Sequence, residues 1–371
     1  MQVTRTPYRP NMQTPCQIRR WLLSSVLCSC WLMLLSAPVP AQTQAPTPYK
    51  LRVVGGLAGV SQFTRWEEPF WTQELSRLSG GKFSADIVPF DRAGVPVAEM
   101  LHLLQLGVVP FGTTLLSSLS AQYLQYTAPD LAGLNPDIAS LKASVTAFRP
   151  FLEKGLRGQG VEVLALYTYP AQVVFCKKPL ASLTDLSGRR VRVSSMGQAD
   201  FVGALGAVPV SVAFNELVGN LQSGNVECAI TGAMSGNTLG LHTMTSHLYA
   251  MPINWGLAIF GANRAAWETL PPDLRALLRR ELPKLEASIW AEVEHDTAQS
   301  ISCITGQSDC KSERKGSMVQ VPISAQDERR RQEIFITTVL PRWLKRCGAR
   351  CGDVWNQTIG PARNILVPTN P

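Results

Sequence analysis

Apolar and polar positions between residues 183 and 237 alternate in a way that predicts three strands separated by two helices. Val191 and Val193 alternate with arginines, which is the period-two pattern of a half-buried strand. Ser195 can cap the helix that follows, and Gly206 can end it. The predicted elements are a strand at 190–194, a helix to 205, a strand at 208–210, a helix at 214–222 and a strand at 226–230.

The pattern in the first third of the chain is similar. It predicts a strand at 51–54, a helix at 63–78, a strand at 83–88, a helix at 97–106 and a strand at 108–113. Strands that alternate with helices favour parallel pairing with right-handed crossovers. Two such units in one chain predict an α/β protein of two lobes, each a mixed, mainly parallel sheet flanked by helices, with a ligand cleft between them.

The remaining segments predict how the lobes are connected. Extended stretches at 161–169 and 172–177, and again at 248–254 and 257–263, would carry the chain from one lobe to the other and back. Helices are predicted at 137–156, 271–302 and 327–347, and Pro283 should kink or interrupt the second of them. We therefore expect lobe I to comprise 49–169 and 257–296, and lobe II to comprise 170–256 and 297–371.

The N-terminus has the layout of a signal peptide. Arg19 and Arg20 precede an apolar run from 21 to 35, and small residues before Gln42 predict cleavage after Ala41. This gives a signal peptide at 1–41, a linker at 42–48, a periplasmic location and no stable membrane insertion after cleavage. An uncleaved anchor, or a lipoprotein using Cys28 or Cys30, is the weaker alternative, and Met12 is a second candidate start.

Composition excludes some partners. The chain has 371 residues, 45% of them hydrophobic, and a formal net charge of +8. The first 41 residues hold four arginines and no acid, so the remainder has 35 − 4 = 31 basic against 27 acidic residues, or +4. No basic stripe with interleaved aromatics is present, which argues against a nucleic-acid partner.

Six cysteines follow residue 41, and export favours disulfides among them. The close pairs Cys303/Cys310 and Cys347/Cys351 are predicted to be bonded, whereas Cys176 and Cys228 lie in apolar strands and are predicted to be reduced. A zinc site is the alternative for the close pairs. It lacks Cys-x2-Cys spacing, and the histidines are scattered at His102, His242, His247 and His295. No metal and no cofactor are expected.

Four segments in sequence order carry a family resemblance. They are LTDLSGRRVRV at 183–193, GAVPV at 206–210, FNEL at 214–217 and LQSGNVECA at 221–229. Together they resemble the periplasmic solute receptors of tripartite ATP-independent (TRAP) transporters, of the dicarboxylate-binding DctP type, and the resemblance extends from about residue 51 to about 290. It implies the two-lobed periplasmic-binding-protein fold with a long hinge helix, a carboxylate ligand, and small and large membrane subunits as partners.

Arg192 is the main candidate for ligand binding. A guanidinium presents paired donors that match the two oxygens of a carboxylate. From the residue alone, an ion pair with Asp185 or Glu216 explains Arg192 equally well. The resemblance favours the ligand role, because the carboxylate-binding arginine of the family matches this position.

Further candidate site residues follow from the same resemblance and from their predicted positions. Gln172 stands where many relatives have a second arginine, and Thr231-Gly232 replace a family asparagine, so a second charged group on the ligand is in doubt. Phe214 and Asn215 match a segment along the pocket, although Phe214 is equally suited to the core. Trp255 could form an aromatic wall or pack in the core, and Asn237 could reach the ligand or cap a helix.

Two other functions are alternatives to transport. A sensor that reports a ligand to a membrane signalling protein would have the same fold. A secreted hydrolase would use Ser235, in a segment one residue away from a Gly-x-Ser-x-Gly elbow, with His242 or His247 as base. Both histidines lie in a structural context without an orienting acid, so we expect a binding protein and not an enzyme.

Overall fold

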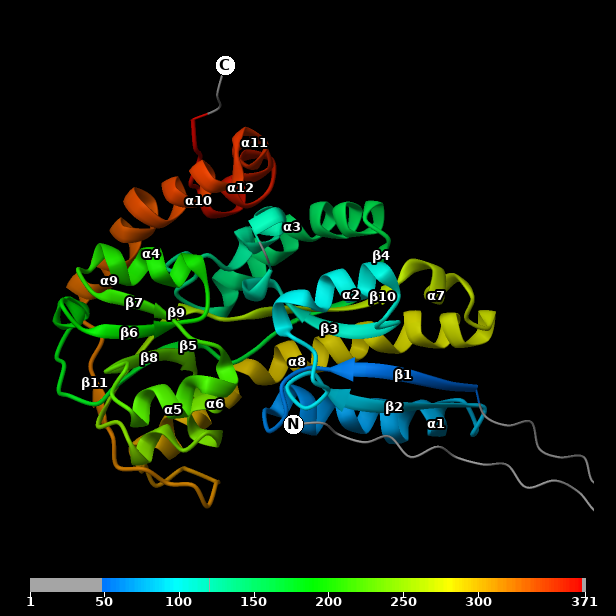
Figure 1. The fold of residues 1–371 in the computed structure, drawn as a ribbon, viewed down its shortest axis with the longest axis horizontal. Coiled ribbons are helices and arrows are strands. Elements are labelled where there is room, and N and C mark those ends of the chain that lie inside the picture. Colours follow the sequence, from blue (N-terminus) through cyan, green and yellow to red (C-terminus); the bar gives the residue numbers. More distant parts are fainter. Residues whose placement is uncertain (1–48, 120, 369–371) are drawn as a thin grey trace, which may run out of the picture. The chain divides into compact units, whose positions relative to one another are not determined.

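The computed structural model describes residues 49–119 and 121–368. The predicted signal peptide (1–41) and linker (42–48) lie outside the described residues. Within them the chain forms two mixed β-sheets with helices on their faces (Figure 1). We call these sheet one and sheet two.

Sheet one has the strand order β2-β1-β3-β10-β4. β1 is parallel to β2 and β3, whereas β10 is antiparallel to both of its neighbours. Its strands are β1 (Tyr49–Gly55), β2 (Phe83–Pro89), β3 (Phe111–Leu115), β4 (Val161–Thr168) and β10 (Leu257–Asn263). β3 begins three residues later than predicted, because Pro110 has no N–H to donate to the ladder and Val108 is exposed in the preceding turn.

The helices that accompany sheet one lie between its strands in sequence, except α7, which follows β10. The predicted helix at 63–78 is present as three consecutive segments, two of them π-helical. The segments are η1 (Gln62–Glu67), η2 (Phe70–Glu74), α1 (Leu75–Leu78), η3 (Val97–Glu99), α2 (Met100–Leu106), η4 (Leu116–Ser118), η5 (Ala121–Asp130), α3 (Ile138–Gly158) and α7 (Arg264–Glu268). Asp137 caps α3 as a short polar side chain before a helix commonly does, by accepting from Ser140 N–H.

Sheet two has the order β11-β9-β5-β8-β6-β7. β6 is parallel to β7 and β8, while β5 is antiparallel to β8 and β9. Its strands are β5 (Gln172–Cys176), β6 (Arg190–Val193), β7 (Val208–Ser211), β8 (Cys228–Gly232), β9 (His247–Asn254) and β11 (Val319–Val321). Its shorter helices are η6 (Leu183–Leu186), α4 (Met196–Ala204), η7 (Phe214–Glu216), α5 (Leu217–Gln222), α6 (Ala233–Thr238) and η8 (Leu241–Thr243).

The chain passes between the sheets twice. β4 of sheet one ends at Thr168 and β5 of sheet two begins at Gln172, and β9 ends at Asn254 before β10 begins at Leu257. The long helix α8 (Pro272–Thr305) packs on β4 of sheet one and on α6 of sheet two. A kink or an interruption was predicted at Pro283. The interruption is wrong, since α8 continues through this residue and its buried apolar face outweighs the hydrogen bond that the proline removes. The kink stays a prediction.

The C-terminal segment is a series of helices: α9 (Ala325–Ile334), η9 (Phe335–Val339), α10 (Leu340–Cys347), α11 (Ala349–Gln357) and α12 (Ile359–Arg363). η9 packs on α4, which follows β6 of sheet two, whereas α12 packs on α3, which precedes β4 of sheet one. The division into lobe I and lobe II therefore remains a proposal, and the C-terminal helices contact both parts.

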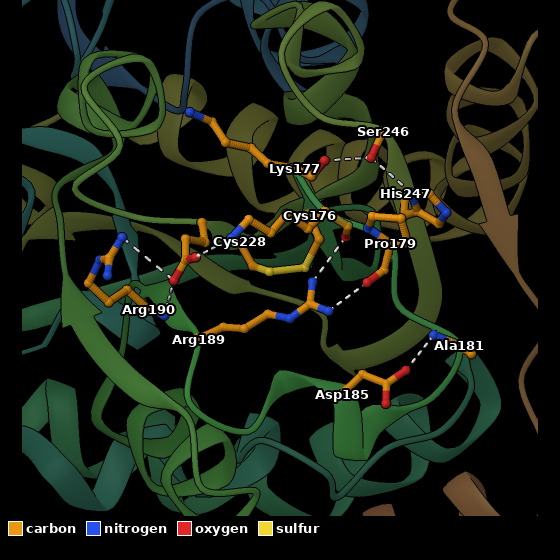
Figure 2. Close-up of a disulfide and its surroundings, with 12 residues drawn as sticks. Cys176, Lys177, Pro179, Ala181, Asp185, Arg189, Arg190, Cys228, Ser246 and His247 are labelled. Carbon is orange, nitrogen blue, oxygen red and sulfur yellow. Dashed lines mark hydrogen bonds and ion pairs between the residues drawn. A yellow bond between two sulfur atoms is a disulfide. The ribbon is translucent and has the colours of Figure 1, made fainter.

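Three disulfides are present in the described residues. Cys303–Cys310 and Cys347–Cys351 are bonded. The prediction that Cys176 and Cys228 are reduced is wrong, because they are bonded to each other in the structure. They are directly opposed in the antiparallel pairing of β5 with β8, with Cα atoms 4.1 Å apart. Figure 2 shows the bridge beside Arg189, which donates to the carbonyl of Pro179.

Candidate functional site

Several candidate residues lie along one edge of sheet two, which is formed by the carboxyl ends of its parallel strands and not by an outer strand. The parallel strands β6, β7 and β8 all have their carboxyl ends at this edge. Gln172 at the start of β5 pairs with Gly232 at the end of β8, and with Asn254 at the end of β9. Both crossings between the sheets start or end here, and ligands of open α/β sheets bind beyond the carboxyl ends of parallel strands.

Arg192 is buried at this edge without a counter-ion. Its side chain is 2% exposed, Nε donates to the carbonyl of Val212 at 3.0 Å and Nη1 to that of Ile230 at 2.7 Å. Both acceptors lie further along the strand direction than Arg192, so the guanidinium is at the carboxyl end of β6. Burial lowers the pKa of Arg192 to about 10, which leaves it charged at neutral pH.

The ion pairs considered for Arg192 are not formed. Asp185 instead accepts from the N–H groups of Ala181 and Ser182 at the start of η6. Glu216 is exposed on η7. No acidic residue in the described part of the chain forms an ion pair with Arg192. The cation is therefore held by carbonyl oxygens alone.

Register places some candidates on the same face as Arg192. Arg192 pairs with Ala229 of β8, and Thr231, two residues further along β8, shares its face and is buried. α6 covers this face, because Gly236 lies directly against the ring of Phe175, the β5 partner of Ala229. Gly232 joins β8 to α6.

The loop after β7 brings a second pair of candidates to the same place. Val212, whose carbonyl binds Arg192, is followed by η7, which starts with Phe214 and Asn215. Phe214 is half-buried and Asn215 is exposed. Both are therefore within three residues of Val212, whose carbonyl accepts a hydrogen bond from Arg192.

Gln172 belongs to a separate buried network. Alternation along β5 puts it on the face opposite to Arg192. Gln198 Nε2 on α4 donates to Gln172 Oε1 and to Asn254 Oδ1, both at 2.8 Å. Asn254 Nδ2 in turn donates to Asp130 at the end of η5. Sequence reasoning missed this network, since a polar residue inside an apolar helix gives no local sign of its partners.

Asp130 fixes the second crossing. It accepts from the N–H groups of Trp255 at 2.9 Å and Gly256 at 2.6 Å. Burial is the main reason that the pKa of Asp130 is raised to about 6, against the lowering effect of these hydrogen bonds. The two crossings are thus connected through Gln172, Gln198, Asn254 and Asp130.

Two candidates have mainly structural contacts. Trp255 is 3% exposed and donates its indole N–H to the carbonyl of Asn135, so it packs in the core. Asn237 lies near the carboxyl end of α6 and donates to the carbonyl of Arg314. Arg192 and Thr231 share one face of sheet two, Gly232 ends β8 next to Thr231, and Phe214 and Asn215 follow the carbonyl that binds Arg192. Gln172 pairs with Gly232 but lies on the opposite face, and Trp255 and Asn237 form other contacts.

A small cavity with about 40 Å³ of space accessible to water lies on the α4 side of the second crossing. Its walls come from η4, η5, the start of α4 and α10, and include Asp130, Ser195, Trp343 and Arg346. Arg192 is not part of its lining. We therefore assign the candidate site by the buried cation and not by this cavity.

Sheet one has its own buried charged group. Glu67 on η1 is 1% exposed and accepts from Gly56 N–H and from the hydroxyl of Thr113, both at 2.6 Å, and from Tyr167. Burial raises the pKa of Glu67 to about 7. The nearby Tyr169 hydroxyl is buried without a hydrogen-bond partner of normal geometry.

The described residues give little support for a metal site or for a serine hydrolase. Within 49–119 and 121–368, no three His, Cys, Asp or Glu side chains are grouped to hold a metal ion. Ser235 is buried on α6, and neither His242 nor His247 is hydrogen-bonded to it; His247 is paired with the Ser246 hydroxyl instead. No helix of the same ranges is long and apolar enough to cross a membrane.

Two mixed sheets, joined by two crossings and a shared long helix, define a two-lobed binding protein of the periplasmic type. The signature of DctP, the bacterial extracellular solute-binding protein family 7, matches residues 67–313, which is more than half of the 371 residues. The chain belongs to this family. The resemblance stated from the sequence and the predicted fold class are both confirmed.

Curated relatives support this assignment over part of the chain. The C4-dicarboxylate-binding periplasmic protein DctP of Rhodobacter capsulatus is 26% identical over 188 residues, which is 50% of this chain and 56% of the relative. The chain spans about half the length of the curated relatives it matches.

Solved structures extend the likeness over nearly the whole fold. The Bordetella pertussis receptor DctP7, which binds pyroglutamic acid, matches with a TM-score of 0.74 and 21% identity over 83% of this chain and 98% of its own. A TRAP solute-binding protein of Desulfovibrio salexigens with bound orotic acid matches with a TM-score of 0.75 and 17% identity, over 86% and 100%. At these identities the likeness concerns the fold.

Proposed function

We propose that the protein captures a small organic acid at the carboxyl edge of sheet two and delivers it to a TRAP-type secondary transporter. Arg192 binds the ligand carboxylate, while Thr231, Gly232, Phe214 and Asn215 contact the rest of the ligand. The lobes close over the bound acid, and closure is favoured because the ligand contacts both of them.

One observation carries this proposal. Arg192 is almost fully buried and has two carbonyl acceptors but no acidic partner in the described residues. An ionised group out of water needs a compensating charge, and arginine does not lose its proton at physiological pH. A ligand carboxylate supplies the missing charge and matches the remaining donors of the guanidinium.

The ligand's other end should be uncharged. Among the described residues assigned to the site, Arg192 is the only cation. Gln172 stands where the resembled family often has a second arginine. The solved relatives hold acids of several kinds, including pyroglutamate, orotate, succinate and malonate. A single carboxylate next to neutral polar groups suits this chain best.

Location and partners complete the proposal. Residues 1–41 act as a cleaved signal peptide, so the mature protein begins near Gln42 in the periplasm, where its disulfides form. It meets the small and large membrane subunits of the transporter there. It binds without turnover and needs no cofactor, which agrees with its membership of a receptor family.

A thermal-shift screen of monocarboxylates, dicarboxylates, keto acids and aromatic acids tests the proposal, followed by calorimetry on each hit. Saturable binding of an acid, lost in Arg192→Ala and kept in Arg190→Ala, is the expected result. Arg190 is the matched control because it lies two residues away on β6 but is exposed and paired with Glu227. Binding of an acid that is unaffected by Arg192→Ala would refute the site.

A further inference from the structure

A contact between α6 and the loop after β1 connects the two sheets. Thr238 Oγ1 donates to the carbonyl of Gly59 at 3.1 Å, and Ser61 N–H donates to Sδ of Met234 at 3.1 Å. The loop at 57–61 follows β1 of sheet one, whereas α6 follows β8 of sheet two. We call the contact of Met234 and Thr238 with loop 57–61 the α6 clasp.

A second loop also binds the carboxyl end of α6. Arg314 Nη1 donates to the carbonyl of Thr238 at 2.7 Å, and Asn237 Nδ2 donates back to the carbonyl of Arg314 at 3.1 Å. Arg314 is thus bound to the residue whose hydroxyl reaches Gly59. A guanidinium is also well suited to the end of a helix, where carbonyl groups lack intrahelical partners.

The loop that carries Arg314 is itself fixed. It leaves α8 at Thr305 and is closed by the Cys303–Cys310 disulfide, whose cysteines are seven residues apart. Gly316 N–H donates to the carbonyl of Cys303 at 2.8 Å, which returns the loop to the end of α8. The arginine is therefore presented from a short braced loop and not from a free tail.

We propose that Arg314 is a positioning residue for closure: it holds the end of α6 so that Met234 and Thr238 contact loop 57–61 and keep the two sheets together. α6 begins directly after Gly232, at the edge that carries Arg192. A contact that must break for the sheets to separate slows that separation, and with it the escape of a molecule held between them.

The consequence for ligand release rests on the proposed function, but the clasp itself is tested without a ligand. Hydrogen exchange followed by mass spectrometry reports the amides of loop 57–61, including the Ser61 N–H that faces Met234. Arg314→Ala should speed exchange in this loop several-fold and leave the strands of sheet one unchanged. Lys315→Ala is the matched control, since Lys315 is the next residue and is equally exposed.

Two further comparisons separate positioning from general stability. Arg314→Lys keeps a cationic donor and should restore part of the protection of loop 57–61. Thr238→Val should speed exchange there, whereas Thr238→Ser keeps the hydroxyl and should not. Combining Arg314→Ala with Thr238→Val should add little to either alone, because both variants break the same chain of contacts.

The proposal is overturned if hydrogen exchange in loop 57–61 is unchanged in both Arg314→Ala and Thr238→Val. It is also overturned if Lys315→Ala changes this exchange as much as Arg314→Ala does. If Arg314→Ala fails to fold, the Thr238→Val and Thr238→Ser pair decides alone. A carboxylate screen without hits would argue against the proposed function and leave the exchange result valid.

Discussion

Glu67 beside sheet one and Arg192 in sheet two are both buried charged groups without an ionic partner in the described residues. They respond to burial differently. The pKa of Glu67 rises to about 7, so the carboxyl can take up a proton and become neutral inside the protein. The pKa of Arg192 falls only to about 10, so its charge remains. Glu67 can thus be neutral without a partner, whereas we propose that Arg192 takes its anion from the ligand.

The largest effect should come from removing this cation. Arg192→Ala should weaken binding of the carboxylate by about 2–5 kcal/mol, which is about thirtyfold to several thousandfold in affinity. Arg192→Lys should lose most of the affinity as well, because an ammonium cannot form the paired contact. Calorimetry measures both. The proteins should still melt cooperatively; a variant that unfolds instead would make Arg192 a structural residue and remove the contrast with Glu67.

The two sheets also differ in covalent support, since sheet two contains Cys176–Cys228 and the described strands of sheet one contain no disulfide. Closing a loop of 52 residues should contribute about 4 kcal/mol on the chain-entropy model. Urea unfolding of the Cys176→Ala/Cys228→Ala variant measures this loss. Its control is Cys303→Ala/Cys310→Ala, for which the shorter loop gives about 2.5 kcal/mol. Equal losses in the two variants would contradict the ranking.

Glu67 should make stability depend on pH. Its pKa is raised from 4.5 in the unfolded chain to about 7 in the folded protein, so the folded state binds the proton more tightly. Its contribution is fully present below pH 4.5 and is lost as the pH rises to about 7, an effect of about 3 kcal/mol.

Glu67→Gln tests this directly. The variant should unfold at higher urea concentration than the parent protein at pH 8 and lose that advantage at pH 5. Glu68→Gln is the control, because Glu68 is the next residue and is exposed. A parent protein with the same stability at pH 5 and pH 8 would contradict this prediction and mean that Glu67 stays ionised in the folded protein.

The smallest effect is expected at Tyr169, on the first crossing beside Glu67. Its buried hydroxyl has no partner of normal geometry, so Tyr169→Phe should not destabilise the protein and should raise the free energy of unfolding by up to about 1 kcal/mol. Ligand affinity should also be unchanged. A loss of affinity in calorimetry would show that the polar group around Glu67 takes part in binding, and that the two regions are less different than their charges indicate.

Local pattern was enough to predict most elements of the fold. The alternation around Val191 and Val193 predicted β6, and glycines predicted where helices end. The extended stretches at 161–177 and 248–263 predicted the strands on either side of the two crossings. Errors arose where one residue changed the ladder, as Pro110 did for β3, or where packing outweighed propensity, as at Pro283 in α8.

The candidate site was harder to predict because its contacts are not local. Arg192 could be singled out from its strand and from the family resemblance, but its two carbonyl partners are 20 and 38 residues away. The bond between Cys176 and Cys228 depends on the register of β5 against β8, which spacing along the chain does not encode. Gln172 was chosen from the family resemblance and Asn237 from a predicted helix start, but Gln172 is hydrogen-bonded to Gln198 and Asn237 to the carbonyl of Arg314.

The position of β10 in sheet one bears on the order in which this sheet can form. β10 lies between β3 and β4, which are not paired with each other, and it comes from residues that follow all of β5 to β9. Until residue 263 has been synthesised, the edges of β3 and β4 that β10 covers therefore remain open. Non-local pairing of this kind is slow. A fragment that stops before residue 257 should aggregate through those edges.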